Sequence, residues 1–218
     1  MNKIVEFILD LIYPPKCAFC RKLIGTGHEG LCPECTEKLP RLSGTDAKSL
    51  LEDGTLCYSA LRYDQMVRDS FLRYKFYGSV SYSDTYSRLM AECLKETAAG
   101  IDIVTWVPLS RKRKRKRGYD QAELLANGTS LLLGLDCKGI LYKNKETKAQ
   151  SLTKSRNERK SNIKGAYTLR KEADIKGKKI IIVDDIITTG ATLSECCAVL
   201  KKAGAASVTA ATFAKAAR

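Results

Sequence analysis

The sequence predicts an α/β protein with a mainly parallel sheet flanked by helices and a small N-terminal metal-binding module. Strand and helix patterns alternate from residue 101 onward, which is typical of a parallel sheet with helices on both faces. Residues 14–42 are instead dense in Cys, Pro, Gly and charged residues and show little periodicity. A chain of 218 residues suits one ordinary domain with a small addition, so we expect a boundary between 1–45 and 46–218.

The individual elements follow from hydrophobic periodicity along the chain. Ile4, Ile8, Leu11 and Ile12 share one helical face, which predicts a short capping helix, with a membrane-surface helix as the alternative. We expect a linker or turn at 41–49, helices at 64–76, 82–97, 119–135 and 192–204, and strands at 56–63, 101–109, 138–143, 166–169, 178–185 and 206–214. Residues 144–164 are polar, basic and unperiodic, and predict a long loop of the kind that is usually functional or mobile.

The charge of the chain is strongly positive and unevenly distributed. The formal net charge is +14, and residues 111–171 carry 18 Lys or Arg but only 5 Asp or Glu. Such a field indicates an anionic partner: phosphate esters, nucleic acid or an acidic membrane surface. The N-terminal segment lacks the pattern of a secretory signal and no run of 18 apolar residues occurs, so we expect a cytoplasmic protein without a membrane span.

Two C-x-x-C pairs predict a structural zinc site. "CAFC" and "CPEC" are separated by 11 residues and place four thiolates for tetrahedral zinc: Cys17, Cys20, Cys32 and Cys35. His28 as a replacement ligand and a redox-active pair are the alternatives. A closed four-thiolate site leaves no open position for catalysis. The other cysteines are interpreted as small, reduced, buried hydrophobes: Cys57, Cys93, Cys137, Cys196 and Cys197.

The stretch "KKIIIVDDIITTGATL" (178–193) places two carboxylates at the expected end of a strand, just before a helix. The carboxyl ends of parallel strands face the crevice where ligands bind, and a helix N-terminus holds phosphate well. The intervening loop adds hydroxyl donors and a glycine that lets the backbone approach an anion: Thr188, Thr189, Gly190 and Thr192. These residues predict a sugar-phosphate site, with the ring hydroxyls on Asp184 and Asp185. The alternative is that Asp185 only caps the helix.

This stretch resembles the phosphoribosyl-pyrophosphate (PRPP) motif of type I phosphoribosyltransferases. "WVPLSRKRKRKRGYDQAELLA", "AQSLTKSRNERKSNIKGAY" and the four-cysteine module extend the resemblance, over most of the chain, to the ComF-like proteins associated with DNA uptake in bacterial competence. One departure is Asp120, where we expect Asn in a "GYNQ"-type element.

The resemblance implies the type I phosphoribosyltransferase fold and an enzyme that binds PRPP with magnesium, expels pyrophosphate and joins a nucleophile to the anomeric carbon. It implies PRPP contacts in the loop after the first core strand and in the motif itself: Pro108, Leu109, Ser110, Arg111, Asp184, Asp185, Thr188, Thr189, Gly190, Ala191 and Thr192. It also implies that residues 144–164 close over the site, with Arg156, Arg159 and Lys160 as candidates to meet the leaving group. The catalytic candidates are Asp184, Asp185, Arg156 and Arg159. Magnesium is expected to be held largely by substrate oxygens. No residue pair indicates a general base, so the acceptor is not named.

The basic run comprises seven consecutive cations: Arg111, Lys112, Arg113, Lys114, Arg115, Lys116 and Arg117. One interpretation is a solvated loop that repels itself and stays mobile. The other is a surface at the mouth of the site that contacts single-stranded DNA through its phosphates. Tyr119, Tyr142 and Tyr167 could stack on bases, with core packing as the alternative.

Three functions are compatible with these features. The first is an active phosphoribosyltransferase with an unnamed acceptor. The second is a competence protein that binds single-stranded DNA with little or no turnover. The third is a scaffold whose zinc module docks a helicase-like or channel protein of DNA uptake.

Overall fold

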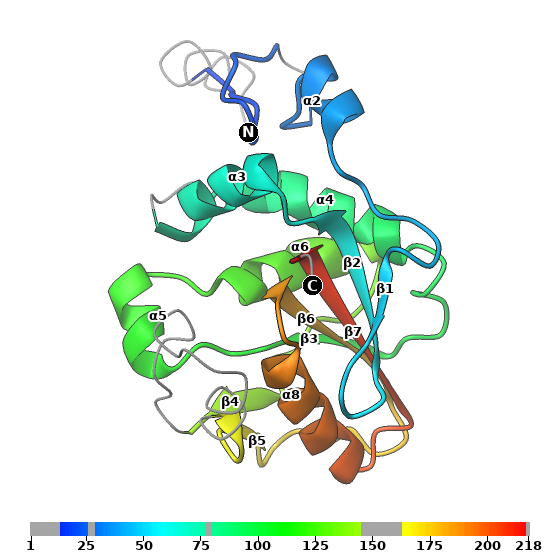
Figure 1. Cartoon of the computed structure of the whole chain (residues 1–218). Coiled ribbons are helices and arrows are strands. Elements are labelled where there is room, and N and C mark those ends of the chain that lie inside the picture. The colour runs from blue at the N-terminus through cyan, green and yellow to red at the C-terminus, as the bar shows by residue number, and fades with distance from the viewer. Residues whose placement is uncertain (1–13, 26–28, 77–79, 145–162, 217–218) are drawn as a thin grey trace.

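The protein is built around a five-stranded sheet. A computed structural model describes residues 14–25, 29–76, 80–144 and 163–216 (Figure 1). The strand order is β1-β2-β7-β6-β3, where the strands are β1 (Lys48–Leu50), β2 (Leu56–Arg62), β3 (Ile103–Trp106), β6 (Lys179–Ile187) and β7 (Ser207–Lys215). Strands β2, β7, β6 and β3 are parallel, whereas β1 pairs with β2 in the antiparallel direction. The expected mainly parallel sheet is therefore present.

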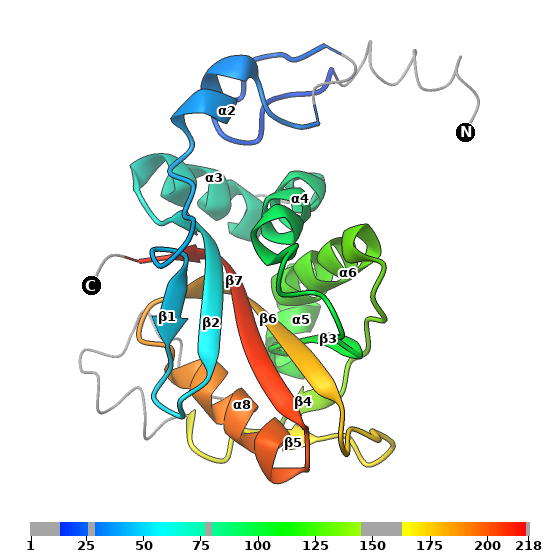
Figure 2. The same cartoon turned by 90° about the vertical axis from the view of Figure 1, so that its right-hand side faces the viewer.

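Helices cover both faces of this sheet (Figure 2). One face packs against α4 (Tyr82–Leu94) and α6 (Gln121–Leu133), with α3 (Gln65–Phe76) beside α4. The other face packs against α8 (Ala191–Lys202), which also contacts β5 of a separate two-stranded antiparallel sheet, formed by β4 (Leu141–Lys143) and β5 (Tyr167–Leu169). Within the described residues, the expected helices and strands are thus present, with somewhat different ends.

The central strand explains why both faces are covered. Ile181 and Val183 belong to the apolar cluster under α4 and α6, while Ile180 and Ile182 belong to the cluster under α8. All four are fully buried. A strand whose alternate side chains all need burial is stable only between two layers.

The structure corrects two expectations about strands. Residues 48–50, which overlap the end of the expected linker at 41–49, form the edge strand β1. This strand has no buried residue and is ordered by backbone pairing with β2 rather than by a hydrophobic pattern. Strand β6 does not end at Asp184 and Asp185 but continues to Ile187. Pairing with β7 carries the strand past both carboxylates, since Asp184 is the register partner of Thr212 and Ile187 that of Lys215.

The structure also corrects the interpretation of the basic run as a loop, because these residues form a helix, α5 (Arg111–Arg117). The Ser110 side chain accepts a hydrogen bond from the Arg113 backbone N–H, and Gly118 ends the helix with φ +82°. The good helix propensity of Lys and Arg and the two caps together offset part of the repulsion between the seven positive charges.

Some expectations fall outside the described residues: the helix at 4–12, His28 and most of the loop at 144–164. Within the described ranges, no helix is long and apolar enough to cross a membrane. Of the five scattered cysteines, Cys57, Cys196 and Cys197 are buried as expected, whereas Cys93 and Cys137 are half-buried against the core.

Candidate functional site

The predicted PRPP motif and the predicted pyrophosphate loop lie side by side at the carboxyl edge of the sheet. Strands β3 and β6 are parallel neighbours, with Trp106 the register partner of Val183. The Val107 N–H donates to the Val183 carbonyl oxygen at 2.9 Å. The chain therefore leaves β3 next to Asp184, which is the arrangement that the sequence predicts for a shared ligand.

The two adjacent carboxylates are half-buried and only partly compensated. Oδ1 of Asp184 accepts from the Asp185 N–H at 2.8 Å, and Oδ1 of Asp185 accepts from the Ile186 N–H at 2.6 Å. Burial, and next the negative charge of Asp185, raise the pKa of Asp184 well above its usual range. Carboxylates with such a perturbed pKa are common at functional sites, and a ligand that donates hydrogen bonds to them would stabilise the pair.

Lys75 is a functional candidate that the sequence did not reveal. Its Nζ lies 3.5 Å from Oδ2 of Asp185, and both side chains are largely shielded from solvent. Lys75 comes from the last turn of α3, which tertiary packing alone brings to the carboxylates. Its charge lowers the pKa of Asp184, against the effect of burial.

The threonine-glycine loop forms the beginning of α8. Gly190 caps this helix with φ +77°, and a Cβ there would lie 2.9 Å from Cδ2 of Leu51, so the position requires glycine. Thr189 Oγ1 accepts from the Ala191 N–H at 3.4 Å, and Thr188 is exposed. A small cavity of about 20 Å³ is lined by Asp184 and residues 186–193. An anion here would meet the N-terminal N–H groups of α8.

The buried Asp120 side chain anchors the predicted pyrophosphate loop through a hydrogen bond. The Leu109 N–H donates to Oδ2 of Asp120 at 2.8 Å, while Oδ1 accepts from the Ala122 N–H at 3.2 Å and so caps α6. Burial raises the pKa of Asp120 to about 6. The acid at this position thus positions the loop of Pro108, Leu109 and Ser110. Two acceptor oxygens satisfy two backbone donors there, which a single Asn oxygen would not.

A second cation approaches the site from the small sheet. Lys143 of β4 is half-buried, and its Nζ donates to the Tyr167 hydroxyl at 3.0 Å. Burial, and then the charge of Arg113, lower the pKa of Lys143, while Asp184 acts in the opposite direction. Lys143 immediately precedes the long basic loop. Its position in the sequence could have marked it, but its electrostatic interaction with Asp184 depends on the fold.

Helix α5 displays most of its cations to solvent, and none of its residues is buried. Lys114 pairs with Glu123, and Arg117 donates to Oε1 of Gln121 at 2.8 Å and lies 5.6 Å from the Phe76 ring centroid. Of the three tyrosines considered for base stacking, Tyr142 is exposed, whereas Tyr167 is buried and Tyr119 is half-buried with its hydroxyl bound to the Tyr74 carbonyl.

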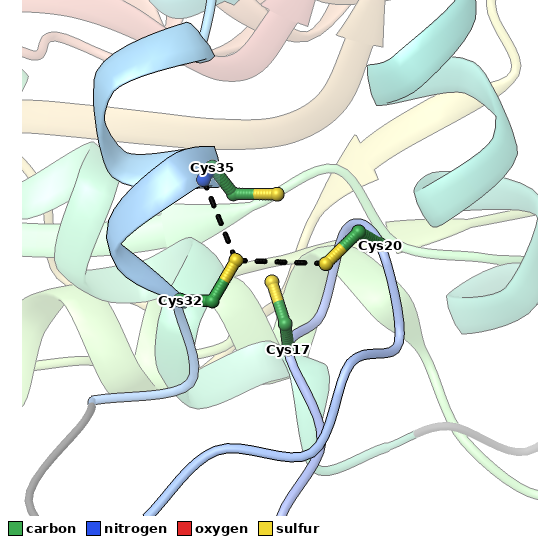
Figure 3. A group of neighbouring side chains, drawn as sticks. All are labelled: Cys17, Cys20, Cys32 and Cys35. Carbon is green, nitrogen blue, oxygen red and sulfur yellow. Dashed lines mark hydrogen bonds between the residues drawn. The ribbon is translucent and has the colours of Figure 1, made fainter.

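The four cysteines of the N-terminal module converge as predicted (Figure 3). Cys17 and Cys20 lie on one tight turn, and Cys32 and Cys35 flank the start of α2 (Pro33–Lys38). The four sulfur atoms all lie within 4.8 Å of one another. Zn–S bonds of about 2.3 Å in a tetrahedron require sulfur separations of about 3.8 Å, so this set fits zinc.

Backbone N–H groups donate to two of the sulfur atoms, whereas burial raises the pKa of the other two thiols, Cys20 and Cys35. The Cys35 N–H donates to Sγ of Cys32 at 3.4 Å. Burial raises the pKa of Cys17, but backbone N–H donors, Cys20 first, outweigh it and lower the pKa to about 7. Cys17, Cys32 and Cys35 are buried, which suits a closed structural site.

The module packs directly on α3 and α4. Arg73 of α3 donates to the Ala18 and Phe19 carbonyl oxygens at 3.1 and 2.6 Å, and Ser70 donates to the Ala18 carbonyl. The Phe19 ring lies 5.9 Å from that of Tyr86 and joins the same apolar cluster as the sheet. The cysteine module therefore shares one apolar cluster with the adjacent helices and the sheet.

Comparison with known proteins agrees with both parts of this architecture. Residues 120–218 match the phosphoribosyl transferase domain family, and residues 8–46 match the double zinc ribbon domain family. Competence protein ComFC of Streptococcus pneumoniae is 30% identical over 199 residues, which cover 88% of this chain and 84% of that protein. The chain belongs to the ComF family.

Other ComF-family relatives extend the likeness. The DNA utilization protein YhgH of Escherichia coli K12 is 27% identical over 220 residues, covering 91% of this chain and 96% of that protein. Among solved structures, a purine phosphoribosyltransferase from Pyrococcus horikoshii is 24% identical, with a TM-score of 0.38 over 62% of this chain and 74% of that one. The family matches confirm the type I phosphoribosyltransferase-like fold with an N-terminal zinc ribbon, and with the cysteine cluster they support structural zinc.

The structure brings together most of the predicted site residues: the carboxylates, the threonine-glycine loop and the loop after β3 all lie at one edge. Arg156, Arg159 and Lys160 lie outside the described residues. Arg111 begins α5 and is exposed.

Proposed function

We propose that this ComF-family protein binds PRPP and transfers its phosphoribosyl group with release of pyrophosphate. The observation that carries the proposal is the carboxylate pair on β6, followed by a glycine-capped helix start, next to the loop that leaves β3. In this arrangement the ribose hydroxyls donate to Asp184 and Asp185, and the 5′-phosphate lies at residues 188–192. Pyrophosphate lies toward residues 108–110, which the Asp120 carboxylate holds in place.

Positioning and charge neutralisation supply most of the catalysis in such a transfer, because the leaving group departs from an oxocarbenium-like centre. Lys143 interacts electrostatically with Asp184, and Lys75 balances the carboxylate pair. Among the described residues, the four cysteines form the only cluster of three or more potential metal ligands. Magnesium would arrive with PRPP and would be held largely by substrate oxygens.

A test of the loop assignment uses ribose 5-phosphate and Thr188→Val, which removes an exposed hydroxyl without a change of shape. Hydrogen bonds to charged groups contribute roughly 1.5–3 kcal/mol, so the affinity should fall about tenfold or more. Thr97→Val is the matched control, since Thr97 follows α4 and precedes the amino end of β3, at the opposite edge of the sheet. Equal loss in both variants, or in neither, would refute the placement of the phosphate.

Contact with single-stranded DNA is a second proposed function, favoured by α5. A helix of seven cations without a buried residue exceeds what one PRPP molecule requires. The names of the relatives, which refer to competence and to DNA utilization, agree with a place in DNA uptake.

Replacement of Lys112, Lys114 and Lys116 by Gln tests the DNA contact. Single-strand binding should weaken, and the log–log salt slope should flatten by about 0.7 for each phosphate that the variant no longer neutralises. The weakening should be similar for different DNA sequences, and PRPP affinity should change much less. No measurable single-strand binding by the wild type at low salt would exclude this second function.

A further inference from the structure

A larger cavity lies beside the proposed phosphate loop and is not explained by PRPP. It has a volume of about 350 Å³ and is formed where β2, β6 and β7 end and β1 begins. We call it the basic cavity, because three of its lining residues are cations: Lys48, Arg62 and Lys215. Thr188 lines both this cavity and the small cavity of the phosphate loop, so the two spaces are neighbours.

Two cations of the basic cavity lie next to each other on neighbouring strands. Arg62 and Lys215 are register partners on adjacent strands, and like charges directly opposite each other destabilise a sheet. In the described part of the chain, the Arg62 side chain is exposed and has no hydrogen-bond or ion-pair partner. None of the lining residues is acidic. A bound anion would relieve this repulsion.

The residues that line the cavity are held in place by specific contacts. Lys215 donates through Nζ to the carbonyl oxygens of Asp46 and Lys48, which ties the start of β1 to the end of β7. Lys48 lies 5.8 Å from the Tyr58 ring centroid. The backbone beneath is paired, since the Tyr63 N–H donates to Lys215 and the Ala216 N–H donates to Ile187. A volume of this size matches typical small-molecule sites.

The order of the strands places this cavity opposite the proposed leaving group. The sheet runs β2-β7-β6-β3, with the sugar phosphate proposed at β6. Pyrophosphate would lie on the β3 side, whereas the basic cavity lies on the side of β7 and β2. In a displacement at the anomeric carbon, the attacking and leaving groups occupy opposite sides.

We propose that the basic cavity binds the acceptor of the transfer, and that the acceptor is a small compound bearing a carboxylate or phosphate. This inference rests on the proposed function. The nucleophilic atom of the acceptor forms a bond to the anomeric carbon, while the bond from that carbon to the pyrophosphate oxygen breaks and its electron pair leaves with pyrophosphate. The proton of the attacking N–H or O–H group passes to water. Arg62 and Lys48 hold the anionic group of the acceptor and so select for it.

Two pairs of probes that share a ring test the charge requirement: nicotinate against nicotinamide, and orotate against uracil. Binding to the full-length, zinc-loaded protein is followed through the backbone amide NMR signals of Ser49, Thr188 and Ala216. Ribose 5-phosphate is present, so that the loop is filled and no transfer occurs. At least one acid should shift these signals and bind about tenfold more tightly than its uncharged partner, as expected for charge-assisted hydrogen bonds.

Arg62→Gln and Lys48→Gln should each remove most of this preference, whereas Arg68→Gln, an exposed arginine of α3 outside the cavity, should not. Absence of any preference for the acids, or an unchanged preference in both cavity variants, overturns the inference. A 5′-phosphorylated oligonucleotide that shifts the same signals, when its 5′-hydroxyl counterpart does not, would assign the cavity to a DNA end and also overturn it.

Calorimetry with magnesium-PRPP distinguishes failure of the acceptor assignment from failure of the proposed function. PRPP binding without a preference for the acids refutes only the acceptor assignment. Binding of the acids without any PRPP binding refutes the proposed function, and the acceptor role with it.

Discussion

Asp120→Asn gives a quantitative test of how the site is supported. The Asp120 carboxyl is buried beneath the proposed pyrophosphate loop, and burial raises its pKa from 3.8 to about 6. The folded protein therefore binds a proton there more tightly than the unfolded chain does. The associated stability is fully present below pH 3.8 and is lost as the pH rises through about 6, a total of about 3 kcal/mol.

Part of this change in unfolding free energy can be measured over a narrower and milder pH range. Between pH 7.5 and pH 5, linkage predicts that the wild type gains about 1.4 kcal/mol of unfolding free energy relative to Asp120→Asn, which has no proton to bind. Urea denaturation at several pH values measures this difference between the two proteins. Titration of other groups, zinc ligands included, is common to both and cancels.

Asp136→Asn, at an exposed carboxylate after the same helix, is the control for removal of a carboxylate that is not buried. If the difference between wild type and Asp120→Asn were constant over this range, the Asp120 carboxyl would not be held desolvated under the Leu109 N–H. The explanation given for an acid at this position would then be wrong.

The remaining predictions concern the metal and the carboxylate pair. Purified protein should contain about one zinc per chain. Cys32→Ser should lose the metal and have a lower melting temperature, because metal binding contributes folding energy to a module that packs on α3. Cys93→Ser should keep the zinc, and metal analysis that finds no zinc in the untreated wild type would refute the site. Lys75→Gln should weaken PRPP binding near neutral pH and less so at higher pH, because removal of the cation leaves the pKa of Asp184 still higher. Lys95→Gln is exposed and should behave like the wild type, and a pH profile of PRPP affinity unchanged in Lys75→Gln would contradict the role of the ion pair.

Local features of the chain were predictable from the sequence because their residues are contiguous. The apolar run of β6 specifies a central strand, and the residues that follow it carry the carboxylates and the loop within ten positions. The zinc ligands are likewise two short motifs, whose spacing alone brings four thiolates together.

Features that depend on packing between distant segments were not predictable. Lys75 reaches Asp185 only because α3 packs beside the sheet, and Arg62 meets Lys215 only through the pairing of β2 with β7. The basic run was expected to be a loop from its charge, but its helix depends on two caps and on contacts with Glu123 and Phe76. Asp120 departs from the phosphate-binding pattern expected from the sequence. Only the hydrogen bond that it accepts from the Leu109 N–H shows that its side chain positions the loop after β3.

The most direct test of the central claim is calorimetry with magnesium-PRPP on three proteins. The wild type and Asp102→Asn, which changes a carboxylate at the opposite edge of the sheet, should bind PRPP. Asp184→Asn combined with Asp185→Asn should not bind it, because the ribose hydroxyls lose their charged acceptors. The double variant should remain at least as stable as the wild type, since burial and mutual repulsion disfavour this carboxylate pair. Unchanged PRPP affinity in the folded double variant, or no binding by the wild type, would contradict the account.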